Sequence, residues 1–189
     1  MGKKEDISQE AIVKVIGAVA IGIFVVKPLL NFFGGNDDDR DTVREQLDTP
    51  LDESPFSREF IPYLQYLTAQ KITNPDEYWA GWKWNYDNGM STDWEGPPNT
   101  LPDLVLTAEQ IYYAFGLMGD SADLVFYLFG RLADQVEVAM IAGYLWANYQ
   151  VDLLAYLKDG SSFFPWNGLS DSELSALIKQ VNNLPVNSQ

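Results

Sequence analysis

The fold of this chain is decided by residues 107–160, which read TAEQIYYAFGLMGDSADLVFYLFGRLADQVEVAMIAGYLWANYQVDLLAYLKDG. Apolar side chains recur in this stretch at intervals of three and four residues, which is typical of helices that bury one face. The pattern is clearest around Val138, Ile141 and Leu145, where we expect a helix that Asp134 and Glu137 cap. The sequence therefore predicts an all-α domain over residues 107–189.

Four further helices are expected in this domain. Thr107 and Gln110 have the spacing of a capping box, so the first helix should begin there and end at the turn that starts with Gly116. Asp120 or Ser121 should cap the second. A short fourth helix should cover residues 153–157, and Ser170 with Glu173 should open a fifth that Pro185 stops.

Residues 35–106 are predicted to be an acidic and aromatic linker with short helices. Asn74 precedes Pro75 and Glu77, which is a helix start. The aromatic rings of this helix are interpreted as packing on the C-terminal domain, and its tryptophans are also candidates for binding a partner or a sugar; they are Trp79, Trp82 and Trp84. The run Asp37–Asp39 is interpreted as a solvated hinge, with a calcium loop as the alternative.

An apolar segment, Ala11–Phe33, lies near the N-terminus and is long enough as a helix to cross a bilayer. We predict that residues 1–34 are a single-pass transmembrane anchor, with the N-terminus on the positive-inside face because of Lys3 and Lys4. A helix buried in a protein assembly and a cleaved signal peptide are the alternatives. The residues expected to define the anchor are Lys14, Gly17, Ala18, Gly22, Phe24 and Lys27.

Charge is divided unevenly along the chain, whose 189 residues carry a net charge of −15. Residues 1–34 hold four lysines and three acidic residues, a balance of +1, whereas the remainder holds 8 basic and 24 acidic residues, a balance of −16. Such a body repels phosphate backbones, so we expect no nucleic-acid partner. The chain has no cysteine and no histidine, which excludes disulfides, thiolate metal sites and histidine-based catalysis.

Residues Ile111 to Gly160 resemble a single annexin repeat. The segment 111–116 is similar to the first annexin helix and its glycine turn, 120–131 to the second helix with its terminal arginine, and 135–149 to the third. Asp152, Leu153 and Leu154, followed by Leu157 and Lys158, resemble the fourth. With the fifth helix the likeness extends over residues 107–185. The resemblance implies a five-helix scaffold.

In annexins, calcium binds to backbone carbonyls of a G-x-G-T turn and to a carboxylate about forty residues later. The corresponding turn here is one residue shorter, has Met118 where the second glycine stands, and lacks the threonine. The resemblance therefore implies a scaffold without a metal or other cofactor, with calcium as the alternative. The candidate ligands of that alternative are Met118, Gly119 and Asp159.

These observations predict a non-enzymatic, membrane-anchored structural or docking protein whose partners are the lipid bilayer and other proteins. Single annexin-like modules also resemble parts of bacterial and bacteriophage structural proteins, which implies a minor virion protein that docks assembly or capsid proteins of a membrane-containing phage. A calcium-dependent or cell-wall-binding module is the first alternative. A peptidoglycan hydrolase that uses a pair of carboxylates is the second.

Overall fold

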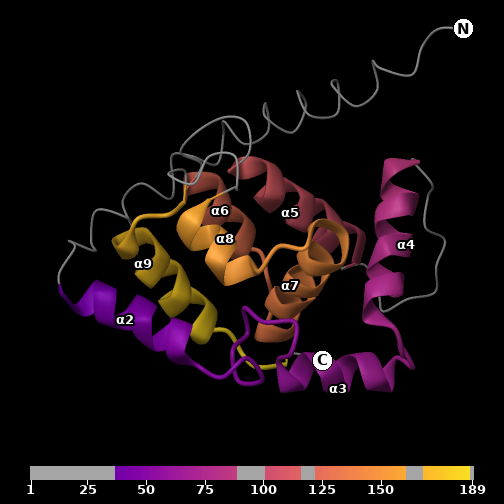
Figure 1. Ribbon diagram of the computed structural model, residues 1–189, viewed down its shortest axis with the longest axis horizontal. Coiled ribbons are helices and arrows are strands. Elements are labelled where there is room, and N and C mark those ends of the chain that lie inside the picture. Colours follow the sequence, from indigo (N-terminus) through magenta and orange to yellow (C-terminus); the bar gives the residue numbers. More distant parts are fainter. Residues whose placement is uncertain (1–36, 89–100, 116–121, 161–167, 188–189) are drawn as a thin grey trace, which may run out of the picture.

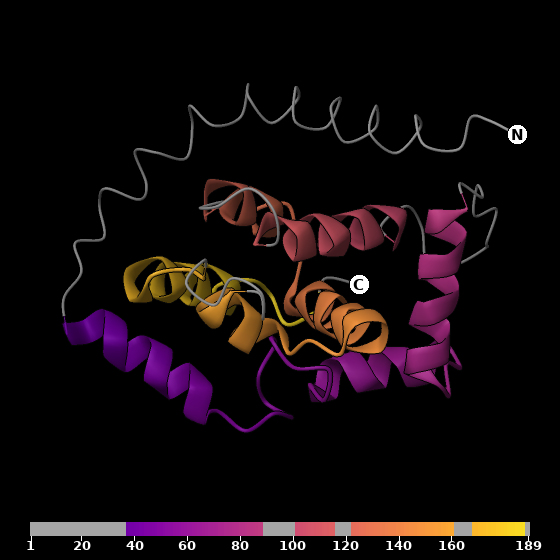
Figure 2. The same ribbon diagram turned by 45° about the horizontal axis from the view of Figure 1, so that its top comes forward.

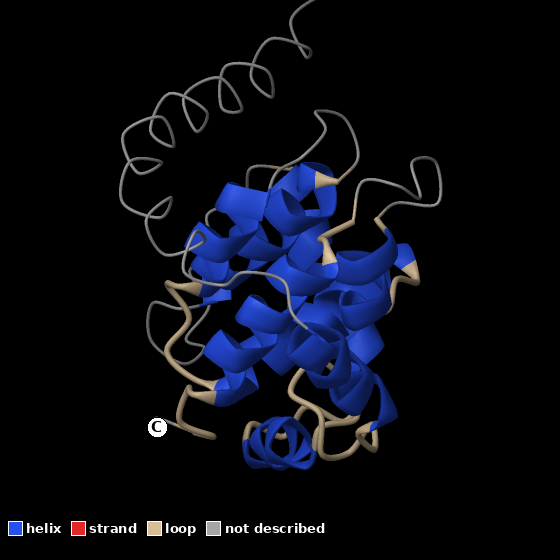
Figure 3. Ribbon diagram, turned by 90° about the vertical axis from the view of Figure 1, so that its left-hand side faces the viewer, coloured by secondary structure: helices blue, strands red, loops and turns tan. Residues whose placement is uncertain are grey.

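The computed structural model describes residues 37–88, 101–115, 122–160 and 168–187. Within these ranges the regular elements are all helices, so the expected all-α class is confirmed for the described part of the chain (Figures 1 and 3). The helices are α2 (Asp37–Asp48), α3 (Ile61–Ala69), α4 (Pro75–Asp87), α5 (Leu101–Ala114), α6 (Ala122–Phe129), α7 (Gln135–Tyr149), α8 (Leu153–Asp159) and α9 (Asp171–Asn182).

Helix α7 is the centre of the molecule. Ten successive residues, Val136 to Leu145, are buried, and the helix contacts α3, α4, α5, α8 and α9 (Figure 1). Such all-round burial explains why its sequence is apolar on every face. The predicted cap is confirmed: the side chain of Asp134 accepts a hydrogen bond from the Glu137 N–H, and the Glu137 carboxylate accepts one from the Ala133 N–H.

Helix α5 begins six residues earlier than the capping box at Thr107 predicted. It starts at Leu101, with Pro102 in its first turn, where the missing N–H costs no helical hydrogen bond. Thr107 and Glu109 are therefore inside the helix, and both are buried. The predicted start at Thr107 was wrong because the helix already begins at Leu101, within the region assigned to the linker.

Helix α4 packs against α7 through aromatic side chains. Its predicted start is confirmed, since the Asn74 side chain accepts a hydrogen bond from the Glu77 N–H. The indole N–H of Trp79 donates to the Tyr63 hydroxyl at 2.8 Å, inside the core. A Cβ atom on Gly143 of α7 would lie 2.5 Å from that hydroxyl. The absence of a side chain at this position therefore allows α3, α4 and α7 to pack closely against one another.

One hydrophobic core crosses the predicted boundary at residue 106. Val43 of α2, Tyr63 of α3 and Trp79 of α4 belong to the same buried cluster as Ile141 of α7 and Leu177 of α9. The region expected to be a linker thus contributes three complete helices and the first turns of α5. Their contribution was underestimated because the buried residues of α2 are mostly polar and those of α3 and α4 are mostly aromatic.

Helix α2 lies beside α9, at the end of the molecule opposite to α4 (Figures 1 and 2). The run Asp37–Asp39, interpreted as a solvated hinge, is instead its first turn, where the helix dipole favours negative charge. Asp39 is buried and accepts a hydrogen bond from the Ser175 hydroxyl at 3.0 Å. The amide of Asn182 donates to the buried side chain of Gln46 at 3.4 Å.

Helices α8 and α9 start where the sequence predicted. Asp152 caps α8, and Ser170 with Glu173 forms the expected capping box of α9. The end of α9 is joined to the start of α7 by Gln135, whose backbone N–H donates to the Pro185 carbonyl at 2.9 Å. The side-chain amide of Gln135 donates to three more carbonyls, those of Val181, Asn182 and Leu184.

Within the described ranges, no helix is long and apolar enough to cross a membrane. The predicted anchor, residues 1–34 with Lys14, Gly17, Ala18, Gly22, Phe24 and Lys27, lies outside those ranges. So do the predicted caps Asp120 and Ser121.

Candidate functional site

The three tryptophans predicted to bind a partner lie in different environments. Trp79 and Trp82 are 1% and 4% exposed, because their rings pack between α4 and the C-terminal helices. Trp84 is 56% exposed, on the outer side of α4. In this structure only Trp84 of the three is open to a partner.

The predicted metal ligands are not brought together in the described part of the chain. Met118 and Gly119 lie outside it, and Asp159 is an exposed residue at the end of α8. Among the described residues, no group of three or more aspartate, glutamate, histidine or cysteine side chains could hold a metal ion. Asp39, from the run considered as a calcium loop, faces Ser175 and Lys179.

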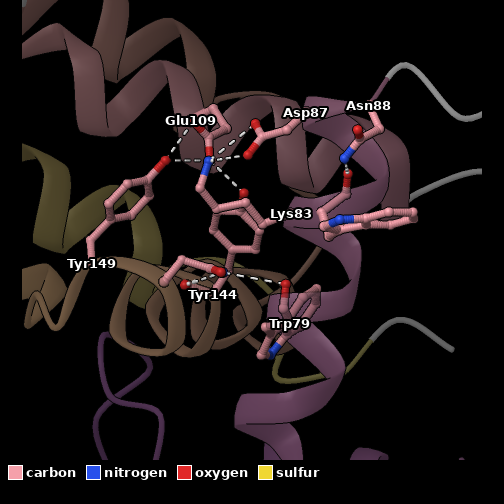
Figure 4. Close-up of polar contacts among 9 residues, drawn as sticks. Trp79, Lys83, Asp87, Asn88, Glu109, Tyr144 and Tyr149 are labelled. Atoms are coloured by element: carbon pink, nitrogen blue, oxygen red, sulfur yellow. Dashed lines mark hydrogen bonds and ion pairs between the residues drawn. The ribbon is translucent and has the colours of Figure 1, made fainter.

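The most unusual chemical group of the described core is the carboxylate of Glu109, which α5 places between α4 and α7 (Figure 4). Glu109 is only 3% exposed. It accepts hydrogen bonds from the hydroxyl of Tyr144 and from that of Tyr149, the latter at 2.6 and 2.7 Å to its two oxygens. A buried carboxylate is tolerated only when its oxygens have such partners.

Lys83 of α4 supplies the opposite charge. Its Nζ lies 3.5 Å from the Glu109 carboxylate and 3.1 Å from that of Asp87, one helical turn further along α4. The ammonium group also lies 5.3 Å from the centre of the Tyr149 ring, within the range of a cation–π contact. Side chains from α4, α5 and α7 thus meet around the ammonium group of Lys83, as Figure 4 shows.

A stack of tyrosine rings adjoins this cluster. The rings of Tyr112 and Tyr149 are nearly parallel with centroids 3.7 Å apart, and Tyr156 follows at 5.8 Å from Tyr112. The Tyr156 hydroxyl donates to the Tyr112 carbonyl at 2.5 Å. The stack extends the contact between α5 and α7 as far as α8.

Burial raises the pKa of both Tyr144 and Tyr149 well above the ordinary value, and their hydrogen bonds to Glu109 raise it further. Burial alone would lower the pKa of Lys83, but its hydrogen bond to Asp87 and the charge of Glu109 raise it overall. Both tyrosines are therefore neutral donors, and Lys83 is a cation, at any physiological pH.

This arrangement stabilises structure and does not match a hydrolytic pair. A glycoside hydrolase needs two carboxylates facing an open space that admits a sugar and water. Here the ammonium of Lys83 occupies the space between Glu109 and Asp87, and Glu109 is enclosed. The cluster, defined as Glu109, Lys83, Asp87, Tyr144 and Tyr149, is called the Glu109 cluster below.

The sequence pattern did not distinguish Glu109 from the other acidic residues of the chain. A signal was present, because Val105, Ala108, Glu109 and Tyr112 have the spacing of one helical face. Extending the first helix towards the N-terminus would have placed Glu109 on the buried face of α5. Its partners could not be read from that pattern, since they come from other helices.

Comparison with known proteins gave no match: no protein-family model, curated protein or solved structure is detectably similar to this chain. The resemblance to an annexin repeat therefore stays a prediction.

Proposed function

We propose that this chain is a non-enzymatic, membrane-anchored docking protein, whose apolar N-terminal segment holds an acidic helical body at a bilayer where it binds a basic protein partner. One observation carries the proposal: a well-filled core is enclosed by a strongly acidic exterior, directly after a segment long and apolar enough to cross a membrane. A large single-signed charge attracts partners of the opposite sign and speeds their association.

The charges of the body support this reading. All 8 basic residues after position 34 lie in the described part of the chain, with 21 of the 24 acidic residues, which gives that part a net charge of −13. Five of the 8 bases are already in ion pairs with acidic residues of the chain; they are Arg40, Arg44, Arg58, Lys83 and Lys179. Most of the other described acidic residues are exposed and can attract cationic partners.

The experiment that tests the anchor is flotation of the full chain with liposomes, with and without calcium. The control is the full chain carrying Val19→Asp and Ile23→Asp, because each charge in the middle of a spanning helix costs about 2.5–3.5 kcal/mol. We expect the unchanged chain to float with the liposomes and the doubly substituted chain to remain at the bottom of the density gradient. Flotation of both chains only when calcium is present would instead favour the calcium-dependent alternative.

A second experiment tests the docking. The full chain in detergent micelles should bind a lysine-rich peptide at low salt and release it as the salt concentration rises, since screening weakens contacts between exposed charges. A glutamate-rich peptide of equal length is the control. Equal binding of both peptides would contradict the proposal.

The narrower proposal is that the partners are assembly or capsid proteins of a membrane-containing bacteriophage. It rests on the annexin-like pattern of residues 107–185 alone. Detection of this chain in purified virions, in proportion to a known minor protein, would test it.

A further inference from the structure

A hollow of about 140 Å³ lies between residues 51–59 and the junction of α7 with α8. Its floor is apolar and buried, formed by Phe56, Ala142 and Leu153. Leu51, which is 53% exposed, and the half-buried Trp146 form its sides. An apolar hollow that opens at the surface can take up an apolar group from a partner.

The mouth of this hollow is acidic. Glu59 and Asp152 line it and are exposed, and the exposed Asp52 and Glu53 follow Leu51 directly in the chain. Among the described residues that line the hollow, Arg58 is the only base. Its guanidinium lies 4.2 Å from the centre of the Trp146 ring and 3.7 Å from the Asp76 carboxylate, so its charge is already balanced within the chain.

We propose that this hollow is the docking site for a basic segment of a protein partner, which inserts one leucine-sized or aromatic side chain between Leu51 and Trp146 and places neighbouring lysine or arginine side chains against Glu59 and Asp152. The proposal rests on the docking function above and specifies the partner's chemistry. We call the site, defined by Leu51, Phe56, Glu59, Trp146 and Asp152, the docking hollow.

The volume of the docking hollow and the charge at its mouth both fit this occupant. Sites for small-molecule ligands span about 300–1,000 Å³, whereas a cavity of about 150 Å³ holds one benzene-sized group. The docking hollow therefore has room for one side chain. A single buried anchor surrounded by polar contacts is how many protein interfaces obtain their affinity. The acidic mouth would repel an acidic segment and attract a basic one.

The test is a titration of the full chain in detergent micelles with short synthetic peptides, followed by residue-resolved NMR. The first peptide has a central leucine between lysines, the second replaces that leucine with serine, and the third keeps the leucine but replaces the lysines with glutamates. We expect the first peptide to shift the signals of residues 51–59, Trp146 and residues 151–153. The serine peptide should bind about tenfold more weakly, because the buried apolar group is lost.

Two pairs of substitutions locate the contact. Leu51→Ser should weaken binding of the leucine peptide about tenfold, whereas Leu64→Ser, which changes a similarly exposed leucine of α3 outside the hollow, should not. Glu59→Lys should weaken binding about fivefold, whereas Glu45→Lys on the exposed side of α2 makes the same change in net charge elsewhere. Each altered residue is exposed, so all four variants should fold.

The outcomes separate this inference from the function on which it rests. If the leucine and serine peptides bind equally, or if Glu45→Lys weakens binding as much as Glu59→Lys, the acidic body attracts cations without a docking hollow. That result overturns the inference and leaves the proposed function standing. If no lysine peptide binds at low salt, both are overturned.

Discussion

The two ends of this molecule are held by helix pairs of opposite character. At one end, α4 packs on α7 through buried aromatic rings, and α5 adds the Glu109 cluster to the same junction. At the other end, α2 packs on α9, and its three buried residues are Asp39, Val43 and Gln46, of which only Val43 is apolar. Buried apolar area contributes about 25 cal/mol per Å², while exposed ion pairs contribute little. Helix α4 is therefore part of the folding core, whereas α2 is attached to it by contacts that salt or a change of pH can weaken.

The largest effect is expected at the aromatic end. Trp79→Ala removes a fully buried ring and leaves the Tyr63 hydroxyl without its donor, so we predict a loss of about 3–5 kcal/mol in the free energy of unfolding. Urea unfolding followed by circular dichroism measures it. Trp84→Ala is the matched control in the same helix and should cost less than about 1 kcal/mol, because Trp84 is exposed. Equal losses in the two variants would show that α4 does not pack as described.

The next effect concerns the Glu109 cluster. Glu109→Ala leaves the hydroxyls of Tyr144 and Tyr149 and the charge of Lys83 without their shared acceptor, so we predict a loss of about 2–3 kcal/mol. Glu109→Gln keeps the shape and an acceptor oxygen and should lose less. The exposed Glu45→Ala is the control and should be nearly neutral. If Glu109→Ala also proves neutral in urea unfolding, the cluster does not tie the three helices together.

Alkaline pH should act on the aromatic end in particular. Burial raises the pKa of Tyr66 from 10.0 to about 12, and those of Tyr63, Tyr144, Tyr149 and Tyr156 are also raised. The folded state therefore holds these protons more tightly than the unfolded state. The resulting stability is fully present below pH 10 and is lost as the pH rises through 10 and beyond. Thermal unfolding at successive pH values should show this decline, and a midpoint that stays constant from pH 9 to 11 would refute it.

The smallest effect is expected at the polar end. Asp39→Asn removes the charge that faces Lys179 and retains an acceptor for Ser175, so the global free energy of unfolding should fall by less than about 1 kcal/mol. Hydrogen exchange in α2 should nevertheless become faster, while exchange in α7 stays unchanged. The neighbouring exposed Asp41→Asn is the control. Equal exchange rates in α2 and α7 in the unaltered chain would abolish the contrast between the two ends.

The features that were predictable from sequence are local ones. Asn74, Asp134 and Ser170 cap their helices as expected because a cap and its acceptor or donor lie three residues apart. The central helix α7 was predictable because its apolar side chains recur at intervals of three and four residues. These contacts involve neighbours along the chain, so the sequence alone specifies them.

The features that were missed depend on residues far apart. Glu109 meets Tyr144 and Tyr149 across 35 and 40 residues, and Asp39 meets Ser175 across 136. A run of acidic residues favours a solvated position, which is why Asp39 was assigned to a hinge together with Asp37 and Asp38. Only the fold shows that a second helix supplies the partners. The docking hollow was missed for the same reason, since its walls come from residues 51–59 and from the junction of α7 with α8.

The attachment of α2 also determines how the molecule would respond to tension. A pull applied at Asp37 acts first on the contacts of α2 with α9, which surround one buried apolar residue, Val43. Helix α2 buries only this one apolar side chain, so it would detach and extend while the core helices stay folded. As a helix the 12 residues of α2 span about 18 Å, but fully extended they span about 40 Å. Extension of α2 would thus lengthen the chain ahead of the core by about 20 Å while α7 stays folded.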